Sequence, residues 1–399
     1  MNIQNTKAWK AAEWEYGEIH AQSLVPFLDF RLSPEEIIER LEEIIEICPK
    51  FYPALLESGL RQLALVGHNQ AKQRLDEGFR LMLELAKPQH LDEELDGLLG
   101  NLEDLWRFDL CRHYLEFLVE RYPHNALFQD YRAHAAARMG DIDEALLYIA
   151  KAVEMEPDNP HFRSNQGWIY LIAGNLKEAG KALAETLRLD PDNEVVKGNL
   201  EIHRYLSKHG GHYFDYLLRP ADKEEIDRLA NEEEWEEVDK LCGSYNDCRM
   251  EAMAQALFKE DEQKRSRLPD LLSTLREFFR FVHKVDQGGY VLNEDLSFIH
   301  EFFKPIMHKF IFKFGDIDCE MIEEIYESLF DYYGFLARQG LVPTKEFKQF
   351  QKKILGMKNE LMEKMQRYNM VRHNDDMDEE EKNAIREELF EGDHAWPFL

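Results

Sequence analysis

The sequence predicts an all-α fold: a helix-pair solenoid in the N-terminal half, followed by a helical C-terminal domain. The first observation is a pattern written twice between residues 126 and 193, in which Phe128 recurs as Phe162 and Gly140 as Gly174. The second is a series of prolines at nearly the same interval, namely Pro53, Pro88, Pro123, Pro157 and Pro191. A fixed period of about 34 residues is typical of stacked helix pairs, which cannot bury an apolar face singly.

Each copy of the pattern is predicted to be two helices joined by a tight turn. The stretches 128–139 and 162–173 carry apolar side chains at helical spacing and contain no proline. Gly140 and Gly174 are expected to end these first helices, because glycine readily takes the left-handed conformation that a helix end needs. The Asp or Asn that follows each glycine can cap the second helix through its side-chain oxygen.

The repeat resembles the tetratricopeptide repeat family. The features shared with that family are the length of the period, the glycine at the inter-helix turn, Glu-Ala in the second helix and a closing Pro-Asp-Asn. The resemblance implies antiparallel helix pairs stacked into a right-handed superhelix, whose inner face usually receives a peptide or protein segment. The family's usual Trp and Leu are replaced by Gln129 and Arg132, and then by Arg163 and Gln166. Phe128 and its counterpart in the next repeat are expected to take over that packing.

The chain is expected to divide into four segments. They are an N-terminal capping segment at 1–32, the repeat array at 33–212, an α-helical domain at 213–370, and an acidic tail with an aromatic tip at 371–399. The glycine pair within His209-Gly210-Gly211-His212 is predicted to end the array, since glycine terminates helices. Beyond it the repeat period is lost, and amphipathic segments separated by Gly or Pro are typical of a helical bundle.

Composition limits the partners and the compartment. The net charge of -29 over 399 residues opposes nucleic-acid binding by the chain as a whole, because phosphate neutralisation needs clustered Lys and Arg. The five cysteines are scattered and the N-terminus lacks an apolar leader, so a cytoplasmic protein is expected. No stretch approaches the roughly 20 apolar residues of a membrane helix.

Enzyme motifs such as GxGxxG, the P-loop, GxSxG and HExxH are absent from the sequence, so we expect no enzyme, no cofactor and no metal. Cys242 and Cys248 are not followed by a second ligand pair for zinc. His300 and His308 lie eight residues apart among aromatic residues and are expected to be core or surface residues rather than ligands. The alternative left open is an enzyme or regulated effector whose catalytic or nucleic-acid-binding site lies in 213–399.

The preferred function is a non-enzymatic scaffold or adaptor that binds a peptide or protein segment in the groove of the array. Carrying the family's inner-face positions onto this sequence gives Asp96, Glu103, Asp104, Asp130, His134, Arg138, Asn165, Trp168 and Ile172. Because this surface runs from acidic to aromatic and apolar, it suits a segment with basic residues at one end and a hydrophobic anchor at the other. The alternative is that several of these side chains only pack against neighbouring helices. A family-type carboxylate clamp is not expected, because only Asn165 fits its pattern.

Two charged features stand apart from the array. The predicted helix 344–369 is the most basic, and it carries Lys345, Lys348, Lys352, Lys353, Lys358, Lys364 and Arg367. We expect a solvated face there, with an anionic-partner site as the alternative. The acidic run from Asp375 to Glu381 precedes the tip Trp396-Pro397-Phe398-Leu399, which we hypothesise to dock in an apolar groove of this chain or of a partner.

Overall fold

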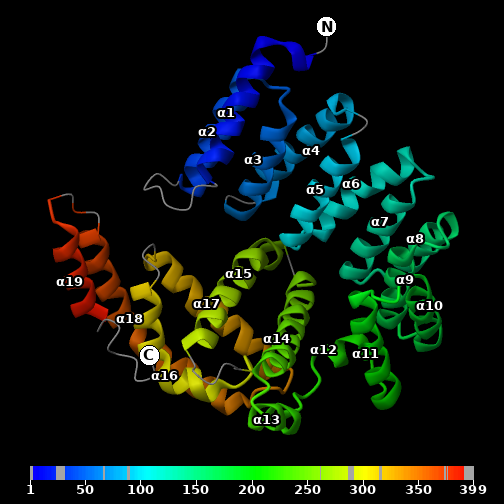
Figure 1. Ribbon diagram of the computed structural model, residues 1–399. Coiled ribbons are helices and arrows are strands. Elements are labelled where there is room, and N and C mark those ends of the chain that lie inside the picture. The colour runs from blue at the N-terminus through cyan, green and yellow to red at the C-terminus, as the bar shows by residue number, and fades with distance from the viewer. Residues whose placement is uncertain are drawn as a thin grey trace. The chain divides into compact units, whose positions relative to one another are not determined.

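The computed structural model describes residues 3–390, except 24–31, 66–67, 88–89, 261, 286–291, 314–316, 373 and 375. Within these residues every regular element is a helix and no strand occurs, so the predicted all-α class is confirmed (Figure 1). The chain divides into two compact units. Unit 1 comprises Met1–Pro157 and Phe258–Pro269, and unit 2 comprises Asp158–Leu257 and Asp270–Leu399. The predicted borders of the four segments stay predictions, and the tip Trp396-Pro397-Phe398-Leu399 lies outside the described residues.

Unit 1 consists mainly of consecutive helix pairs. Its helices are η1 (Ile3–Asn5), α1 (Lys7–Ser23), α2 (Pro34–Ile47), α3 (Tyr52–Leu65), α4 (His68–Leu85), α5 (Leu91–Asp104), α6 (Phe108–Arg121), α7 (Ala126–Met139) and α8 (Ile142–Met155). Contacts join α1 to α2, α2 to α3, α3 to α4, α5 to α6, α6 to α7 and α7 to α8. Helix α3 also contacts α5, which is the first helix of the next pair. The proline series therefore marks real helix pairs upstream of the clearest repeats.

The core of unit 1 is one continuous apolar cluster that runs from α1 to α7. The Trp9 ring of α1 belongs to it, with its centroid 5.0 Å from Phe51 and 6.0 Å from Tyr52. At the other end of the cluster Phe128 is buried, and in unit 2 its repeat counterpart Phe162 is buried as well, as predicted. Helix α1 is therefore packed into the array's core rather than resting on its surface.

The turns within the helix pairs use the left-handed conformation. Gly140 has φ +88° and Gly174 has φ +73°, as predicted. Trp106 stands at the equivalent turn of the preceding repeat and adopts the same conformation, with φ +54°. The Asn175 side chain caps the following helix as expected, but Asp141 makes no such bond. The Asp141 carboxylate instead pairs with the Arg112 guanidinium, which explains why that prediction was wrong.

Unit 2 begins with the second clear repeat and continues into longer helices. Its elements are α9 (Pro160–Ile172), α10 (Leu176–Leu189), α11 (Glu194–His209), α12 (Tyr213–Leu217), α13 (Lys223–Asn231), α14 (Trp235–Phe258), α15 (Glu262–Val285), α16 (Leu296–Lys313), α17 (Cys319–Arg338), α18 (Thr344–Arg372) and α19 (Glu379–Phe390). Phe258 and the first two turns of α15 belong to unit 1. Helix α11 contacts both α9 and α10, and α18 contacts α16, α17 and α19. No described helix is long and apolar enough to cross a membrane.

Helix α16 contains Pro305 and is kinked at Phe302, whose φ and ψ are non-helical. Because proline has no N–H, the Glu301 carbonyl loses its usual helical donor. The Lys353 ammonium of α18 supplies donors instead, to the His300 carbonyl and, at 3.4 Å, to the Glu301 carbonyl. The most basic helix is thus bound to its neighbour through at least one of its lysines.

Candidate functional site

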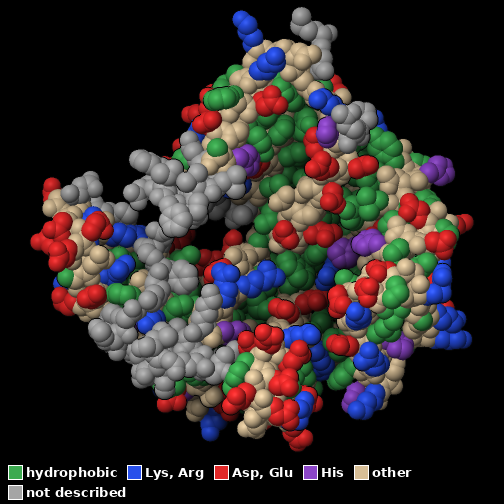
Figure 2. All heavy atoms as spheres, viewed as in Figure 1, with side chains coloured by type: hydrophobic (Ala, Val, Ile, Leu, Met, Phe, Trp, Pro, Cys, Tyr) green, Lys and Arg blue, Asp and Glu red, His purple; other side chains and the backbone are tan. Residues whose placement is uncertain are grey.

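An open groove of about 700 Å³ lies on unit 1 between α1, α3 and α5. Its lining residues are Tyr16, His20, Tyr52, Pro53, Leu56, Glu57, Leu60, Arg61, Glu94, Leu98, Asn101, Asp104 and Leu105. Figure 2 shows hydrophobic side chains gathered over this part of unit 1, with acidic side chains among them. Helices α3 and α5 are the first helices of successive pairs, so the groove lies where the resemblance places a partner surface.

The helical period brings the groove residues to one face. Leu56 and Leu60 are four residues apart on α3, and Leu98 and Asn101 are three apart on α5, so each pair projects from one side of its helix. Leu98 is almost fully buried and forms part of the floor, while Asn101 is exposed. Asp104 is also exposed and lies at the end of α5. The groove therefore combines an apolar floor with a polar margin.

Much of the charge inside the groove is neutralised by pairing. The Glu57 carboxylate lies 2.7 Å from the Arg61 Nη2 and 2.9 Å from the His20 Nε2. The Tyr52 hydroxyl donates a 2.7 Å hydrogen bond to Glu94. Burial raises the pKa of Tyr16, and the nearby Glu57 charge raises it further, so the Tyr16 hydroxyl stays neutral. None of the residues described as lining the groove is an activated nucleophile.

The predicted site residues of unit 1 form contacts between α5 and α7. The Tyr131 hydroxyl donates to Asp96, and the His134 Nδ1 lies 3.0 Å from the Glu103 carboxylate. The Arg138 Nε lies 3.3 Å from the His134 Nε2, so Glu103, His134 and Arg138 form a chain. Among the remaining predicted residues, Asp130 is buried and Asp104 lines the groove. The part of these residues in partner binding stays a prediction.

The predicted site residues of unit 2 are Asn165, Trp168 and Ile172 on α9. Trp168 is 8% exposed, because Tyr213 of α12 covers it in an edge-on contact with ring centroids 6.4 Å apart. Its indole N–H donates to the Tyr213 hydroxyl at 3.5 Å. Asn165 lies 3.2 Å from the His161 ring nitrogen, and Ile172 is half-buried. The hydrophobic anchor position at Trp168 is therefore already in contact with unit 2's own chain.

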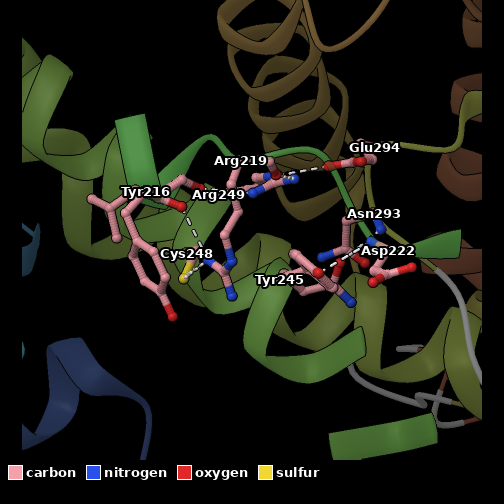
Figure 3. Close-up of polar contacts among 10 residues, drawn as sticks. Tyr216, Arg219, Asp222, Tyr245, Cys248, Arg249, Asn293 and Glu294 are labelled. Carbon is pink, nitrogen blue, oxygen red and sulfur yellow. Dashed lines mark hydrogen bonds and ion pairs between the residues drawn. The ribbon is translucent and has the colours of Figure 1, made fainter. Parts of the chain in front are cut away.

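A buried arginine cluster in unit 2 was not predicted (Figure 3). Arg249 is fully buried, and its Nε lies 2.6 Å from the Glu294 carboxylate. Its other nitrogens donate to the backbone carbonyls of Leu217 at 2.7 Å and Arg219 at 2.5 Å. These bonds join α14 to the last residue of α12, to the chain just after α12 and to the residues before α16. Nothing local in the sequence distinguishes Arg249 from other arginines, because its partners lie 30 to 45 residues away.

The same cluster accounts for one of the two cysteines considered as zinc ligands. The Arg219 guanidinium stacks 3.9 Å from the Tyr216 ring centroid and donates to the Cys248 sulfur at 3.3 Å (Figure 3). Burial raises the pKa of Cys248 and, to about 12, that of Cys242, so both thiols stay protonated. Across the described part of the chain, no group of three or more His, Cys, Asp and Glu residues is placed to hold a metal.

The α5–α6 turn carries a second feature that the sequence interpretation missed. The Trp106 ring lies edge-on to Phe108 at 5.4 Å, and the Arg138 guanidinium lies about 6 Å from both rings. Arg107 is buried and forms two hydrogen bonds with Asp109, at 2.9 and 2.8 Å. Aligning three repeats rather than two would have found Trp106, because it stands where the next two repeats have glycine.

Comparisons with known proteins agree with the predicted resemblance. The tetratricopeptide repeat family model matches residues 132–194, and no curated protein sequence matches the chain. Among solved structures, YrrB, described as a TPR protein with an unusual peptide-binding site, is 18% identical with a TM-score of 0.32, covering 49% of this chain and 98% of YrrB. The TPR domain of P58(IPK) is 13% identical with a TM-score of 0.23, and the match covers 89% of this chain and 88% of that domain. Both TM-scores are low, so the resemblance rests on the sequence match at residues 132–194.

Proposed function

Starting from a chain whose residues 132–194 are tetratricopeptide repeats, we propose that it is a non-enzymatic interaction scaffold whose unit 1 groove receives a segment of a partner protein. Repeat arrays of this kind characteristically present extended concave surfaces for binding. The observation that supports the proposal best is the open groove between α1, α3 and α5. Its volume of about 700 Å³ is enough for a few side chains of an extended or helical segment.

The lining residues suggest the chemistry of the partner segment. The floor is supplied by aliphatic side chains such as Leu56 and Leu98, which favour an apolar anchor. Asp104 stands exposed at one end, where it can attract a Lys or Arg of the partner. We therefore propose a partner segment with one apolar anchor and a basic residue that reaches Asp104.

We also propose that the protein works in a reducing compartment, as a cytoplasmic protein does. All five cysteines are free thiols, and three of them, Cys48, Cys111 and Cys242, are buried. Free thiols in a chain of this length are typical of reducing conditions.

Peptide selection tests the groove directly. Purified full-length protein would be used to select peptides from a random displayed library, in parallel with Asn101→Arg and Asp104→Lys. We expect the wild type to enrich peptides with an apolar residue and a nearby Lys or Arg. Asn101→Arg should enrich few peptides because it places a long cation in the groove, whereas Asp104→Lys should lose the preference for basic residues.

The matched control is Glu120→Lys, which makes the same charge change as Asp104→Lys but at an exposed position of α6 outside the groove. It should select the same peptides as the wild type. Equal melting temperatures would show that the exposed substitutions leave the fold intact. If Asn101→Arg and Asp104→Lys select the wild-type peptides, the partner does not bind in this groove.

The alternative of a catalytic or nucleic-acid-binding site in 213–399 is not favoured by a specific observation on the described residues. Three of the α18 lysines that were candidates for an anionic partner have partners within unit 2. Lys358 lies 3.5 Å from Glu323, Lys364 lies 3.5 Å from Glu360, and Lys353 donates to backbone carbonyls of α16.

A further inference from the structure

Three side chains from the α14–α15 junction, which belongs to unit 1, contact α6 and the end of α7 in the same unit. Phe258 ends α14, is 4% exposed, and meets Phe108 edge-on with ring centroids 6.3 Å apart. The Arg265 guanidinium lies 3.9 Å from the Asp109 carboxylate. The Lys259 ammonium lies beside Gly140 at the end of α7, where an added Cβ would come within 3.2 Å of it. We call Phe258, Lys259 and Arg265 the internal ligand.

The internal ligand is held together as one piece. The Arg265 Nε donates to the Phe258 carbonyl at 3.2 Å, and the Arg265 guanidinium lies 4.7 Å from the centroid of the Phe258 ring. The aromatic ring and the cation are therefore presented side by side. Such a pattern, an aromatic residue with basic residues close by, can be reproduced by a short segment of another polypeptide.

The surface beneath the internal ligand complements its chemistry. We call Trp106, Phe108, Asp109 and Gly140 the turn surface. The Phe108 ring receives the Phe258 ring, and Asp109 receives the Arg265 cation. Lys259 lies at the C-terminal end of α7, where the helix dipole attracts a positive charge. Each cation therefore meets a negative charge or a negative helix end.

Backbone strain also marks this surface. Trp106 keeps φ +54°, although the next two repeats place glycine at the equivalent position. A bulky residue in the left-handed region costs free energy, and such residues concentrate at ligand-binding and switching sites. The Trp106 ring lies edge-on to Phe108, which in turn contacts the internal ligand.

The contacts are of kinds that a competitor can replace. The Arg265–Asp109 contact is long, at 3.9 Å, and Asp109 already pairs with Arg107 at 2.8 Å, so Arg265 is the weaker of the two partners of this carboxylate. Lys259 is exposed. Covalent attachment also keeps the local concentration of the internal ligand at the turn surface high, in addition to the buried contact between Phe258 and Phe108.

We propose that the turn surface is a second recognition site, distinct from the groove, for a polypeptide segment that carries an aromatic residue next to basic residues. Phe258, Lys259 and Arg265 occupy this site as a built-in competitor until such a segment displaces them. A basic segment with a hydrophobic anchor is also what the acidic-to-aromatic inner face led us to expect from the sequence. Here that pattern is found in the chain itself.

The test uses the full-length protein and a fluorescein-labelled synthetic peptide with the sequence of residues 254–269. Arg265→Glu should free the turn surface, because it places a carboxylate against Asp109. We expect fluorescence anisotropy to show at least tenfold tighter peptide binding to Arg265→Glu than to the wild type. A second peptide, with Ser for Phe258 and Glu for Arg265, should bind neither protein.

The matched control is Arg280→Glu, which makes the same charge change at a side chain that is 63% exposed and paired with Glu277 on its own helix. It should bind the peptide as weakly as the wild type. Phe258→Ala provides a second way to release the internal ligand, and amide exchange at residues 103–111 should rise in both released variants. Asn101→Arg added to Arg265→Glu should leave peptide affinity unchanged, which separates this site from the groove.

Two results would overturn the proposal. One is equal affinity of the native peptide for the wild type and for both released variants. The other is equal binding of the native and the substituted peptide to Arg265→Glu, since recognition would then not depend on the aromatic and basic side chains.

Discussion

Substitutions at Trp106 can measure the backbone strain in the α5–α6 turn. The comparison is between Trp106→Ala and Trp106→Gly, which both remove the indole ring but differ in the Cβ at φ +54°. Both variants lose the edge-on contact with Phe108, worth about 0.5–1.5 kcal/mol. Both also lose the Arg138 cation–π contact, worth about 0.5–1 kcal/mol. These shared losses cancel in the comparison.

The remaining difference is set by the backbone. An L-residue in the left-handed conformation costs about 1–2 kcal/mol, which glycine avoids. Glycine loses more conformational entropy on folding, by about 0.5–1 kcal/mol. We therefore expect Trp106→Gly to be more stable than Trp106→Ala by about 0.75 kcal/mol, the difference between the midpoints of these two ranges.

Hydrogen exchange measured on peptides covering α5 and α6 is the suitable assay, because a chain with two units need not unfold in one step. Gly140→Ala is the control at the equivalent position, where φ is +88° and the added Cβ also meets Lys259. Gly140→Ala should lower the local opening free energy measured on peptides covering α7 and α8. Equal stability of Trp106→Ala and Trp106→Gly would refute the strain at this turn.

Three further predictions concern stability. Arg249→Met should lower the free energy of unfolding by about 3–5 kcal/mol, because it leaves the Glu294 carboxylate buried without its cation; calorimetry of a double-mutant cycle with Glu294→Gln would show additive losses if the two groups do not interact. Gly100→Ala should stabilise α5 by up to about 1 kcal/mol, since an added Cβ there meets nothing within 4 Å; an unchanged or lower urea midpoint would contradict this. Burial alone would raise the pKa of Asp109, but the bond and charge of Arg107 and the Arg265 charge outweigh it and lower that pKa. The stability from Asp109 is therefore present above its unfolded pKa of about 3.9 and lost as pH falls through the folded value; Asp109→Asn should flatten this acid-side loss, and an unchanged acid profile would count against it.

The parts of the fold that could be predicted are those that depend on short sequence patterns, such as a turn glycine or a repeated aromatic residue. Gly140 and Gly174 occupy the same turn in consecutive repeats, and a conformation with positive φ selects glycine over other residues. The burial of Phe128 and Phe162 followed from their shared place in the period. Asp141 shows the limit of this reasoning, because Arg112 competes for the carboxylate that would otherwise cap α8.

The candidate site was less predictable, since it depends on contacts between distant parts of the chain. The family pattern indicated where first-helix residues such as Asp104 face, but not that α1 would supply one wall of the groove. Trp168 is covered by Tyr213, which lies 45 residues later in the sequence. Phe258 meets Phe108, although the helices from α7 to α13 lie between them along the chain. The repeat period of a single sequence does not predict such contacts between distant residues.

The bend of α16 has a consequence for the alignment of its neighbour. Lys353 is one side chain on a helix of 29 residues, and it contacts both the Glu301 carbonyl, whose helical donor Pro305 removes, and the neighbouring His300 carbonyl. Sliding α18 by one position would bring Lys352 or Ile354 to that place and turn the wrong side of the helix toward α16. The contacts of Lys353 therefore fix the register of α18 relative to α16.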